Sequence, residues 1–187
     1  MKRLLIVIGM RLRPFIRLIL QIFFEKRYLQ GRYFDTSMTG YAWAFRAIWQ
    51  RNILRLAPPL PFPAALTCTI ANAQNLEFEP DDLNNMQAFG AYYQNALGRI
   101  ILGRGCYVAP NVGLITANHD PRNLDLHLAG EDIVLGPGCW IGMNSVLLPG
   151  TRLGPGTVVA AGSVVTKSFP EGRCVVAGVP AKRVRSL

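Results

Sequence analysis

The sequence predicts an all-β domain of stacked coils, a parallel β-helix, that follows a basic helical segment. Two observations carry this prediction: a six-residue hydrophobic period in the second half of the chain, and a net positive charge that is confined to the first third. The chain has 187 residues and a formal net charge of +9. Half of its residues are hydrophobic, which excludes an intrinsically disordered chain. The length suits one domain, or one domain with an appendage.

The six-residue period is continuous over residues 135–166. Aliphatic residues recur at Leu135, Ile141, Leu147, Leu153, Val159 and Val165, and an earlier run has Leu102, Val108 and Leu114. Small residues follow four positions after most of them, at Cys139, Ser145, Thr151, Thr157 and Ser163. This period fits one side of a triangular prism, in which three hexapeptides complete a coil and each short strand pairs with the coils above and below. A sandwich of short strands would instead alternate with period two.

The excess of positive charge lies in the N-terminal third. Residues 1–57 contain 11 basic and two acidic residues, whereas residues 58–187 contain nine of each sign. A basic segment that is also strongly apolar indicates an anionic membrane surface rather than nucleic acid, for which no recognition fold is evident. We therefore divide the chain into a membrane-associating segment, residues 1–62, and a β-helix domain, residues 63–187.

Two stretches of this N-terminal segment have the pattern of helices. In residues 14–27, the side chains of Arg17, Gln21 and Glu25 continue the four-residue spacing of the preceding Arg13 and form one polar stripe, and most other positions are apolar. Residues Tyr41–Leu56 repeat this aromatic and cationic character, and a proline-rich run at 58–63 ends helical structure. The wide apolar face of 14–27 fits a membrane interface, but it fits packing against a partner subunit or this chain's own body as well.

The first residues resemble a signal peptide only in part. Lys2 and Arg3 precede the apolar run Leu4–Met10, but no small-residue cleavage site follows. Arg11, Arg13 and Arg17 interrupt any stretch of about 20 apolar residues, the length that a spanning helix needs. The sequence therefore disfavours a transmembrane helix here.

The four cysteines do not form a recognisable metal or redox motif. Cys68, Cys106, Cys139 and Cys174 are widely spaced, and no C-x-x-C pair exists. We interpret them as buried reduced thiols, which fits a reducing compartment, although their even number leaves disulfides open. We expect no metal site.

The register of the period slips between Leu114 and Leu135. These residues are 21 apart, three more than one coil of 18, so a loop at about residues 116–133 must protrude. The loop holds both histidines of the chain, His119 and His127. Because a neutral imidazole can take a proton near neutral pH, a histidine in the long register break is a candidate general base.

The chain resembles the hexapeptide-repeat acyltransferases, and most closely their maltose/galactoside O-acetyltransferase branch and its polysaccharide-modifying relatives. The resemblance covers about residues 100–187 and rests on the segments Ile101–Gly103, Ala109–Val112, Thr116–His119, Cys139–Gly142, Leu148–Gly150, Ala161–Lys167 and Ala177–Ala181. It implies a left-handed parallel β-helix, an exception to the usual right-handed crossover. It also implies a homotrimer with clefts between adjacent prisms.

The resemblance further implies the site residues. His119 matches the catalytic base, and Asn111 an acceptor-binding residue. The positions that match the coenzyme A groove, or lie near the active site, are Trp140, Gly142, Met143, Asn144, Ala161, Thr166, Lys167, Lys182 and Arg185. For the acceptor we add Asn118 and Asp120 from the loop, and Tyr93 and Asn95 from a polar, aromatic stretch. Asp120 and Asp125 are also candidates to orient His119, and Asn111 has an alternative role as a turn residue.

These observations favour an acetyl-CoA-dependent O-acetyltransferase that modifies a sugar hydroxyl of a lipid-linked surface-polysaccharide precursor. The enzyme would be cytoplasmic and peripheral on the inner face of the plasma membrane. Two alternatives stay open: a transferase for a free sugar, an amino sugar or serine, and a β-helix scaffold or binding module without catalysis. The intact His119 loop argues against the scaffold.

Overall fold

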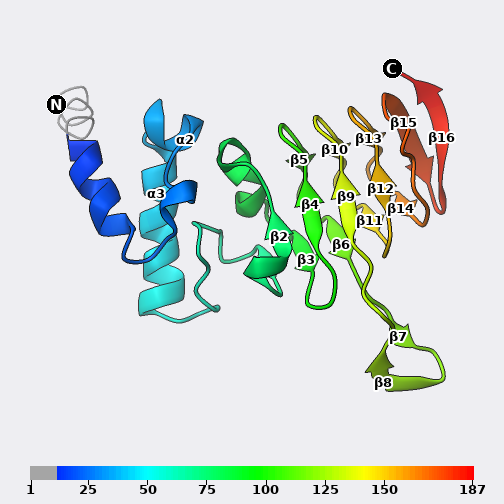
Figure 1. Cartoon of the computed structure of the whole chain (residues 1–187), viewed down its shortest axis with the longest axis horizontal. Helices are drawn as coiled ribbons and strands as arrows, with labels where there is room; N and C mark the ends of the chain where they lie inside the picture. Colours follow the sequence, from blue (N-terminus) through cyan, green and yellow to red (C-terminus); the bar gives the residue numbers. More distant parts are fainter. Residues whose placement is uncertain (1–11) are drawn as a thin grey trace. The chain divides into compact units, whose positions relative to one another are not determined.

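The computed structural model describes residues 12–187 and divides the chain into two compact units, Met1–Leu66 and Thr67–Leu187. The sequence features at Lys2, Arg3, Leu4–Met10 and Arg11 lie outside the described residues. The C-terminal unit is built of short strands and the N-terminal unit of helices (Figure 1).

Three parallel sheets form the sides of the C-terminal unit. Sheet 1 has the order β1 (Thr69–Ile70), β3 (Tyr92–Gln94), β6 (Gly113–Ile115), β11 (Val146–Leu147) and β14 (Val164–Val165). Sheet 2 has β5 (Tyr107–Val108), β10 (Trp140–Ile141), β13 (Val158–Val159), β15 (Cys174–Gly178) and the antiparallel edge strand β16 (Ala181–Ser186). Sheet 3 has β2 (Leu76–Glu77), β4 (Ile100–Leu102), β9 (Ile133–Leu135) and β12 (Arg152–Leu153). Successive strands visit sheets 3, 2 and 1 in turn, which is the predicted triangular coil.

The six-residue period supplies the core of this coil. Each predicted inward position is buried: Leu102, Val108, Leu114, Leu135, Ile141, Leu147, Leu153, Val159 and Val165. Neighbouring coils align these residues one above another, as in the pairs Ile141↔Val159 and Leu147↔Val165. The burial of one aliphatic side chain per side therefore stabilises the stack along its whole length.

The close approach of neighbouring coils at their corners explains why glycine often directly follows the inward aliphatic residue. At Gly142, an added Cβ would lie 2.6 Å from the backbone N of Ala161 in the next coil, which is too close for any side chain. Two residues later in the hexad, the chain turns through a left-handed conformation, which is held by Gly138, Gly150, Gly156 and Gly162 and twice by asparagine, at Asn111 and Asn144. Asparagine tolerates this conformation better than most residues, so both substitutions keep the turn.

The first coil departs from the repeat. A 3₁₀ segment, η4 (Pro80–Gln87), takes the place of a strand next to β5, after the shorter η3 (Ala73–Asn75). The buried side-chain amide of Asn85 donates to the carbonyl of Cys106 at 3.0 Å and accepts from the N–H of Val108 at 2.9 Å. It thus satisfies edge groups of β5 that a strand would otherwise pair.

The N-terminal unit is helical. Its described part begins in a helix at residues 12–20 and continues with η1 (Lys26–Tyr28), α2 (Arg32–Asp35), α3 (Thr39–Ala47) and a π-helical extension of α3, η2 (Ile48–Ile53). The first helix ends earlier than the predicted residue 27, because the chain turns after Leu20. This turn buries Phe24, Tyr28 and Leu29, and places the Tyr28 ring 5.0 Å from that of Phe62.

Among residues 12–187, none of the helices combines the length and the apolar character that a membrane span requires.

Removal of one core aliphatic tests the coil. We expect Leu147→Ala to lower the free energy of unfolding by about 2–5 kcal/mol, because it leaves a cavity where the side chain is fully buried. Leu97→Ala, at an exposed position of the same unit, should change it by no more than about 0.5 kcal/mol. Chemical denaturation of both variants measures the difference, and equal effects would contradict the assigned core.

Candidate active site

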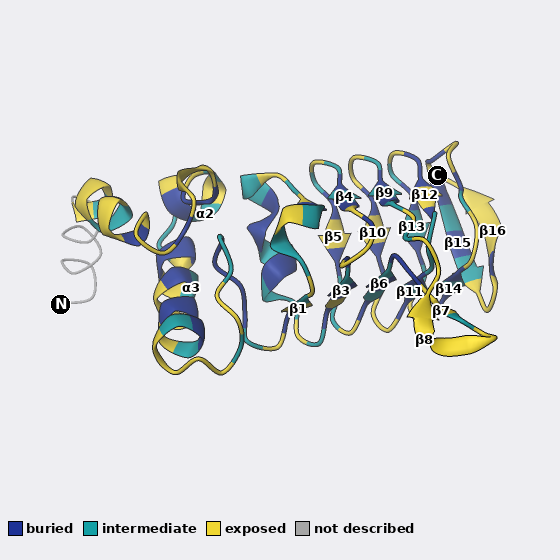
Figure 2. Cartoon of the chain, turned by 60° about the horizontal axis from the view of Figure 1, so that its bottom comes forward, coloured by how far each residue is buried: buried dark blue, intermediate teal, exposed yellow. Residues whose placement is uncertain are grey.

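The predicted loop forms a hairpin that projects from the coil between sheets 1 and 3 (Figure 1). Its antiparallel strands are β7 (His119–Asp120) and β8 (Asn123–His127), with His119 paired to His127. All residues of β8 are exposed (Figure 2). The hairpin therefore presents its side chains outside the core, where a substrate can reach them.

Two sets of contacts fix the base of the hairpin. On the side where the chain leaves the coil, the side-chain oxygen of Gln94 accepts from the N–H groups of Thr116 at 3.1 Å and Ala117 at 3.2 Å. On the side where the chain returns, Asp132 accepts from Arg99 through the backbone N–H at 2.8 Å and the guanidinium at 2.9 Å. Both partners belong to the preceding coil, so the rigid stack holds the hairpin at either end.

His119 is exposed, and one ring nitrogen has a defined partner. Its Nδ1 lies 2.7 Å from the backbone carbonyl oxygen of Leu124. A carbonyl oxygen can only accept, so in the neutral ring the proton resides on Nδ1 and Nε2 carries a lone pair. The hairpin therefore orients His119 with a free basic nitrogen, which is the state that a general base requires.

The second histidine lies directly against the first. The rings of His119 and His127 have their centroids 4.2 Å apart, with an interplanar angle of 39°. The sequence favoured His119 over His127 as the base because only His119 lies in the family motif, and it did not predict this ring contact, which arises only when β8 folds back on β7. The sequence likewise did not predict that Gln94 anchors the base of the hairpin or that the Leu124 carbonyl contacts His119 near its tip.

The neighbouring loop residues are placed differently from the expectation. Asn118 is exposed beside His119, where acceptor contact stays a prediction. The carboxylate of Asp120 bonds instead to Arg122, whose side chain and backbone N–H lower the pKa of that carboxyl. Asp120 is therefore ion-paired within the turn, and its contact with an acceptor stays a prediction. The carbonyl of Leu124, rather than a carboxylate, orients His119.

Two predicted acceptor residues lie inside the coil. Tyr93 is 0% exposed, and its hydroxyl faces the carbonyl of Asn85 at 3.4 Å. Asn95 is also 0% exposed, and its amide exchanges hydrogen bonds of 3.0 and 2.7 Å with the backbone of Asn72. The prediction that these two residues contact an acceptor is corrected, since their side chains stabilise the stacking of the first coils.

Several positions that were assigned to the coenzyme A groove gather at the corner between sheets 2 and 1. Trp140 is 56% exposed on the outer face of β10. Met143 and Asn144 follow at the corner, and Ala161 lies one coil further, where the N–H of Gly162 bonds to the carbonyl of Met143 at 2.8 Å. Gly142 itself is buried, so its close approach to Ala161 serves the fold.

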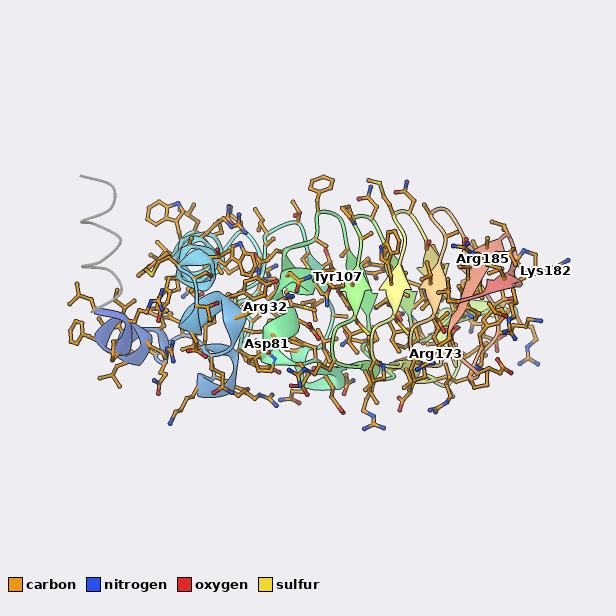
Figure 3. The ribbon with its side chains drawn as sticks, turned by 90° about the horizontal axis from the view of Figure 1, so that it is seen from above. Arg32, Asp81, Tyr107, Arg173, Lys182 and Arg185 are labelled. Carbon is orange, nitrogen blue, oxygen red and sulfur yellow. The ribbon has the colours of Figure 1, made fainter. Side chains whose placement is uncertain are left out.

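The remaining groove positions lie elsewhere on the surface. Thr166 and Lys167 are exposed at the corner between sheets 1 and 3, the same corner from which the His119 hairpin projects. Lys182 and Arg185 are exposed on β16 at the end of the stack (Figure 3). Asn111 is exposed and adopts the left-handed backbone conformation, as expected for its alternative role as a turn residue. Its contact with an acceptor stays a prediction.

Apart from Lys182 and Arg185 on β16, a single chain therefore presents these candidate residues at two different corners of the prism, one at each end of the strands of sheet 1. His119, Thr166 and Lys167 flank one edge of sheet 1, whereas Met143, Asn144 and Ala161 flank the other edge, with Trp140 beyond it on sheet 2. The strands of sheet 1 separate the two sets.

The described residues contain no cluster of three or more histidine, cysteine or acidic side chains that could hold a metal ion. The four cysteines are buried free thiols, as the sequence interpretation expected.

Comparison with known proteins agrees with this architecture. Residues 132–167 match the family model of the bacterial transferase hexapeptide (six repeats). Galactoside O-acetyltransferase of Escherichia coli K12 is 37% identical over 92 residues, which are 47% of this chain and 44% of that protein. "Putative lipopolysaccharide biosynthesis O-acetyl transferase WbbJ" of the same organism is 34% identical over 114 residues, 54% of this chain and 58% of that protein.

A solved galactoside acetyltransferase in complex with coenzyme A superposes with a TM-score of 0.50 at 26% identity, covering 64% of this chain and 62% of that one. The chain spans about half the length of the curated relatives it matches. The predicted resemblance to hexapeptide-repeat acetyltransferases is thus confirmed, and it implies the left-handed β-helix.

The anchoring role of Gln94 can be tested on the hairpin itself. Gln94→Leu removes the acceptor for the Ala117 N–H, so we expect the local opening free energy to fall by about 1 kcal/mol or more. Amide hydrogen exchange across residues 116–128 measures this change. Gln74→Leu, at an exposed position in the first coil, is the matched control and should leave that exchange unchanged. Equal exchange in both variants would contradict the anchor.

Proposed function

We propose that this protein transfers an acetyl group from acetyl-CoA to a hydroxyl of a sugar, with His119 as the general base. The observation that carries the proposal is the 2.7 Å contact between His119 Nδ1 and the Leu124 carbonyl, which leaves Nε2 available on an exposed hairpin. The similarity to galactoside and lipopolysaccharide O-acetyltransferases supports the reaction class.

In this reaction, Nε2 of His119 accepts the proton of the sugar hydroxyl as its oxygen attacks the thioester carbonyl. The tetrahedral intermediate then collapses, the C–S bond breaks, and the imidazolium returns the proton to the leaving thiolate. No acyl-enzyme forms, so catalysis depends on holding both substrates beside one imidazole. The Leu124 carbonyl assists twice, because it fixes the tautomer before attack and accepts from the imidazolium after it.

Acetyl-CoA has suitable partners on this surface. The small side chain of Ala161 and the exposed Met143 leave room for the pantetheine arm near the corner of sheets 2 and 1. The exposed cations Lys167, Lys182 and Arg185 are suited to its phosphates. The aromatic ring of Trp140 offers an apolar wall near the thioester.

We propose a homotrimer in which the active site lies between two chains. The support is geometric: His119 and the Trp140 corner flank opposite edges of sheet 1, so one chain does not bring them together. Rotational symmetry can place the hairpin edge of one prism against the other edge of the next.

The proposed acceptor is a lipid-linked precursor of a surface polysaccharide, modified at the inner face of the plasma membrane. Cytosolic acetyl-CoA and a lipid-linked sugar meet at that surface. The name of the lipopolysaccharide-related relative and the basic N-terminal unit both support this acceptor class. Peripheral attachment to an anionic membrane would bring the enzyme to its acceptor.

Loss of the base tests the chemistry. We expect His119→Ala to lower kcat by at least about 10²-fold, as is typical when a general base is removed. His119→Asn is a sharper variant, because its amide can still donate to Leu124 but has no basic nitrogen, and kcat should fall as far. Acetyl transfer from acetyl-CoA to sugars and to lipid-linked glycan measures kcat, and retained coenzyme A affinity shows that the fold is intact. Near-normal turnover by either variant would refute the role of His119.

Complementation tests the composite site. His119→Ala and Trp140→Ala damage opposite edges, so each variant alone should be impaired. A mixed trimer contains interfaces where an intact His119 meets an intact Trp140. Random mixing makes about a quarter of the interfaces intact, and we expect activity to recover toward that fraction. Mixing without recovery, under conditions where subunits exchange, would contradict a shared site.

A further inference from the structure

The first helix of the N-terminal unit turns Arg13 and Arg17, together with the buried Leu20, toward the rest of that unit, whereas the other members of the predicted polar stripe are exposed. Nη1 of Arg13 donates to the carbonyl of Asp35 at 2.6 Å, and Nη2 of Arg17 lies 2.8 Å from the Asp35 carboxylate. Several large apolar side chains point outward: on the helix Phe15 is 63% and Leu18 62% exposed, and in the turn that follows it Ile22 is 77% exposed. An amphipathic helix that packs on a water-surrounded body normally has the opposite orientation.

The second helix of the unit packs through apolar residues, but it also leaves a large apolar face exposed. Ala44, Ala47 and Ile48 are buried, whereas Phe45, Trp49 and Ile53 are 52–58% exposed. These three are four residues apart along α3 and η2, so they lie on one face of the continuous helix. Leu54 and Leu56 extend the exposed apolar surface at its end. Figure 2 shows the alternation of buried and exposed positions along α3.

The charge of the unit identifies what can cover these faces. Arg46 and Arg55 are exposed beside the apolar positions of the second helix. The two acidic residues of the unit are each bound by an arginine, Asp35 by Arg17 and Glu25 by Arg27 at 2.7 Å. The remaining charge is strongly positive. Apolar and aromatic side chains with flanking arginines match an anionic lipid surface, where rings enter the interface and cations meet headgroups.

We propose that the outward faces of residues 12–22 and 45–56 form a docking surface for an anionic lipid bilayer. The helices lie in the interface. Phe15 and Leu18 of the first helix, Ile22 of the turn after it, and Phe45, Trp49 and Ile53 of the second helix are immersed among the acyl chains. This docking surface is independent of the acetyl transfer chemistry, because every residue in it belongs to the N-terminal unit. It also explains why Arg13 and Arg17 face the protein rather than the headgroups.

Vesicle sedimentation of the full chain tests the surface. The wild type should sediment with vesicles of phosphatidylglycerol and phosphatidylcholine, and bind phosphatidylcholine alone more weakly. Phe45→Ser/Trp49→Ser should reduce binding at least about tenfold, since it removes two apolar insertions. Arg46→Gln should reduce binding to the anionic vesicles about fivefold, with a smaller effect on neutral ones. Phe89→Ser/Leu97→Ser, at exposed positions of the β-helix unit, is the matched control and should bind as the wild type does.

A tryptophan variant separates insertion from adsorption. Anionic vesicles should shift the wild-type tryptophan emission to the blue. Trp49→Phe should keep the binding but lose most of the shift. An absence of wild-type binding, or equal binding by Phe45→Ser/Trp49→Ser, would overturn the proposal. If the wild type does not bind vesicles and the Phe45→Ser/Trp49→Ser variant forms smaller particles than the wild type, the face instead mediates contacts between copies of this chain. Because acetyl-CoA affinity should be normal in the double variant, its measurement distinguishes a failed docking surface from a failed active site.

Discussion

The close stacking of consecutive coils is the constraint on which the rest of the structure depends. Strands two or three residues long cannot form a stable sheet alone, so each needs partners in the coils above and below. That contact requires small residues at the most crowded corner positions, as at Gly142, and a left-handed turn in most hexads. The aliphatic repeat then fills the interior. Where the six-residue repeat is uninterrupted, the chain forms no protruding loop.

Function becomes possible where the stack is interrupted. The insertion between β6 and β9 leaves the coil at one corner, and Gln94 and Arg99 of the preceding coil hold its two ends. Within it, the pairing of β7 with β8 presents the Leu124 carbonyl to His119. A rigid, repetitive scaffold thus positions an exposed imidazole without burying it. In the N-terminal unit, Arg13 and Arg17 of the first helix contact Asp35, and α3 packs through Ala44 and Ala47. Both helices nevertheless leave large apolar side chains exposed.

The sequence alone predicted the coil, its inward residues and the position of the protruding loop, because each depends on a local six-residue spacing. It did not predict contacts that require distant residues to meet. The stacking of His127 on His119 and the anchoring by Gln94 are of this kind. The prediction that Tyr93 and Asn95 contact an acceptor was wrong, because the same polar residue types serve two purposes. They occur in sugar-binding surfaces, but here their buried side chains form hydrogen bonds with the backbone of neighbouring segments. The orientation of the first helix could not be predicted either, since periodicity identifies a polar stripe but not whether that stripe faces the protein or the solvent.

The central claim is that the His119 hairpin of one chain and the Trp140 corner of another enclose one acetyl-transfer site. An experimental structure with bound coenzyme A tests this most directly. We expect the thiol to lie in a cleft between two chains, within reach of Nε2 of His119 from one chain and beside Met143 and Ala161 of the next. Coenzyme A bound entirely within one chain, or with its thiol remote from His119, would contradict the account.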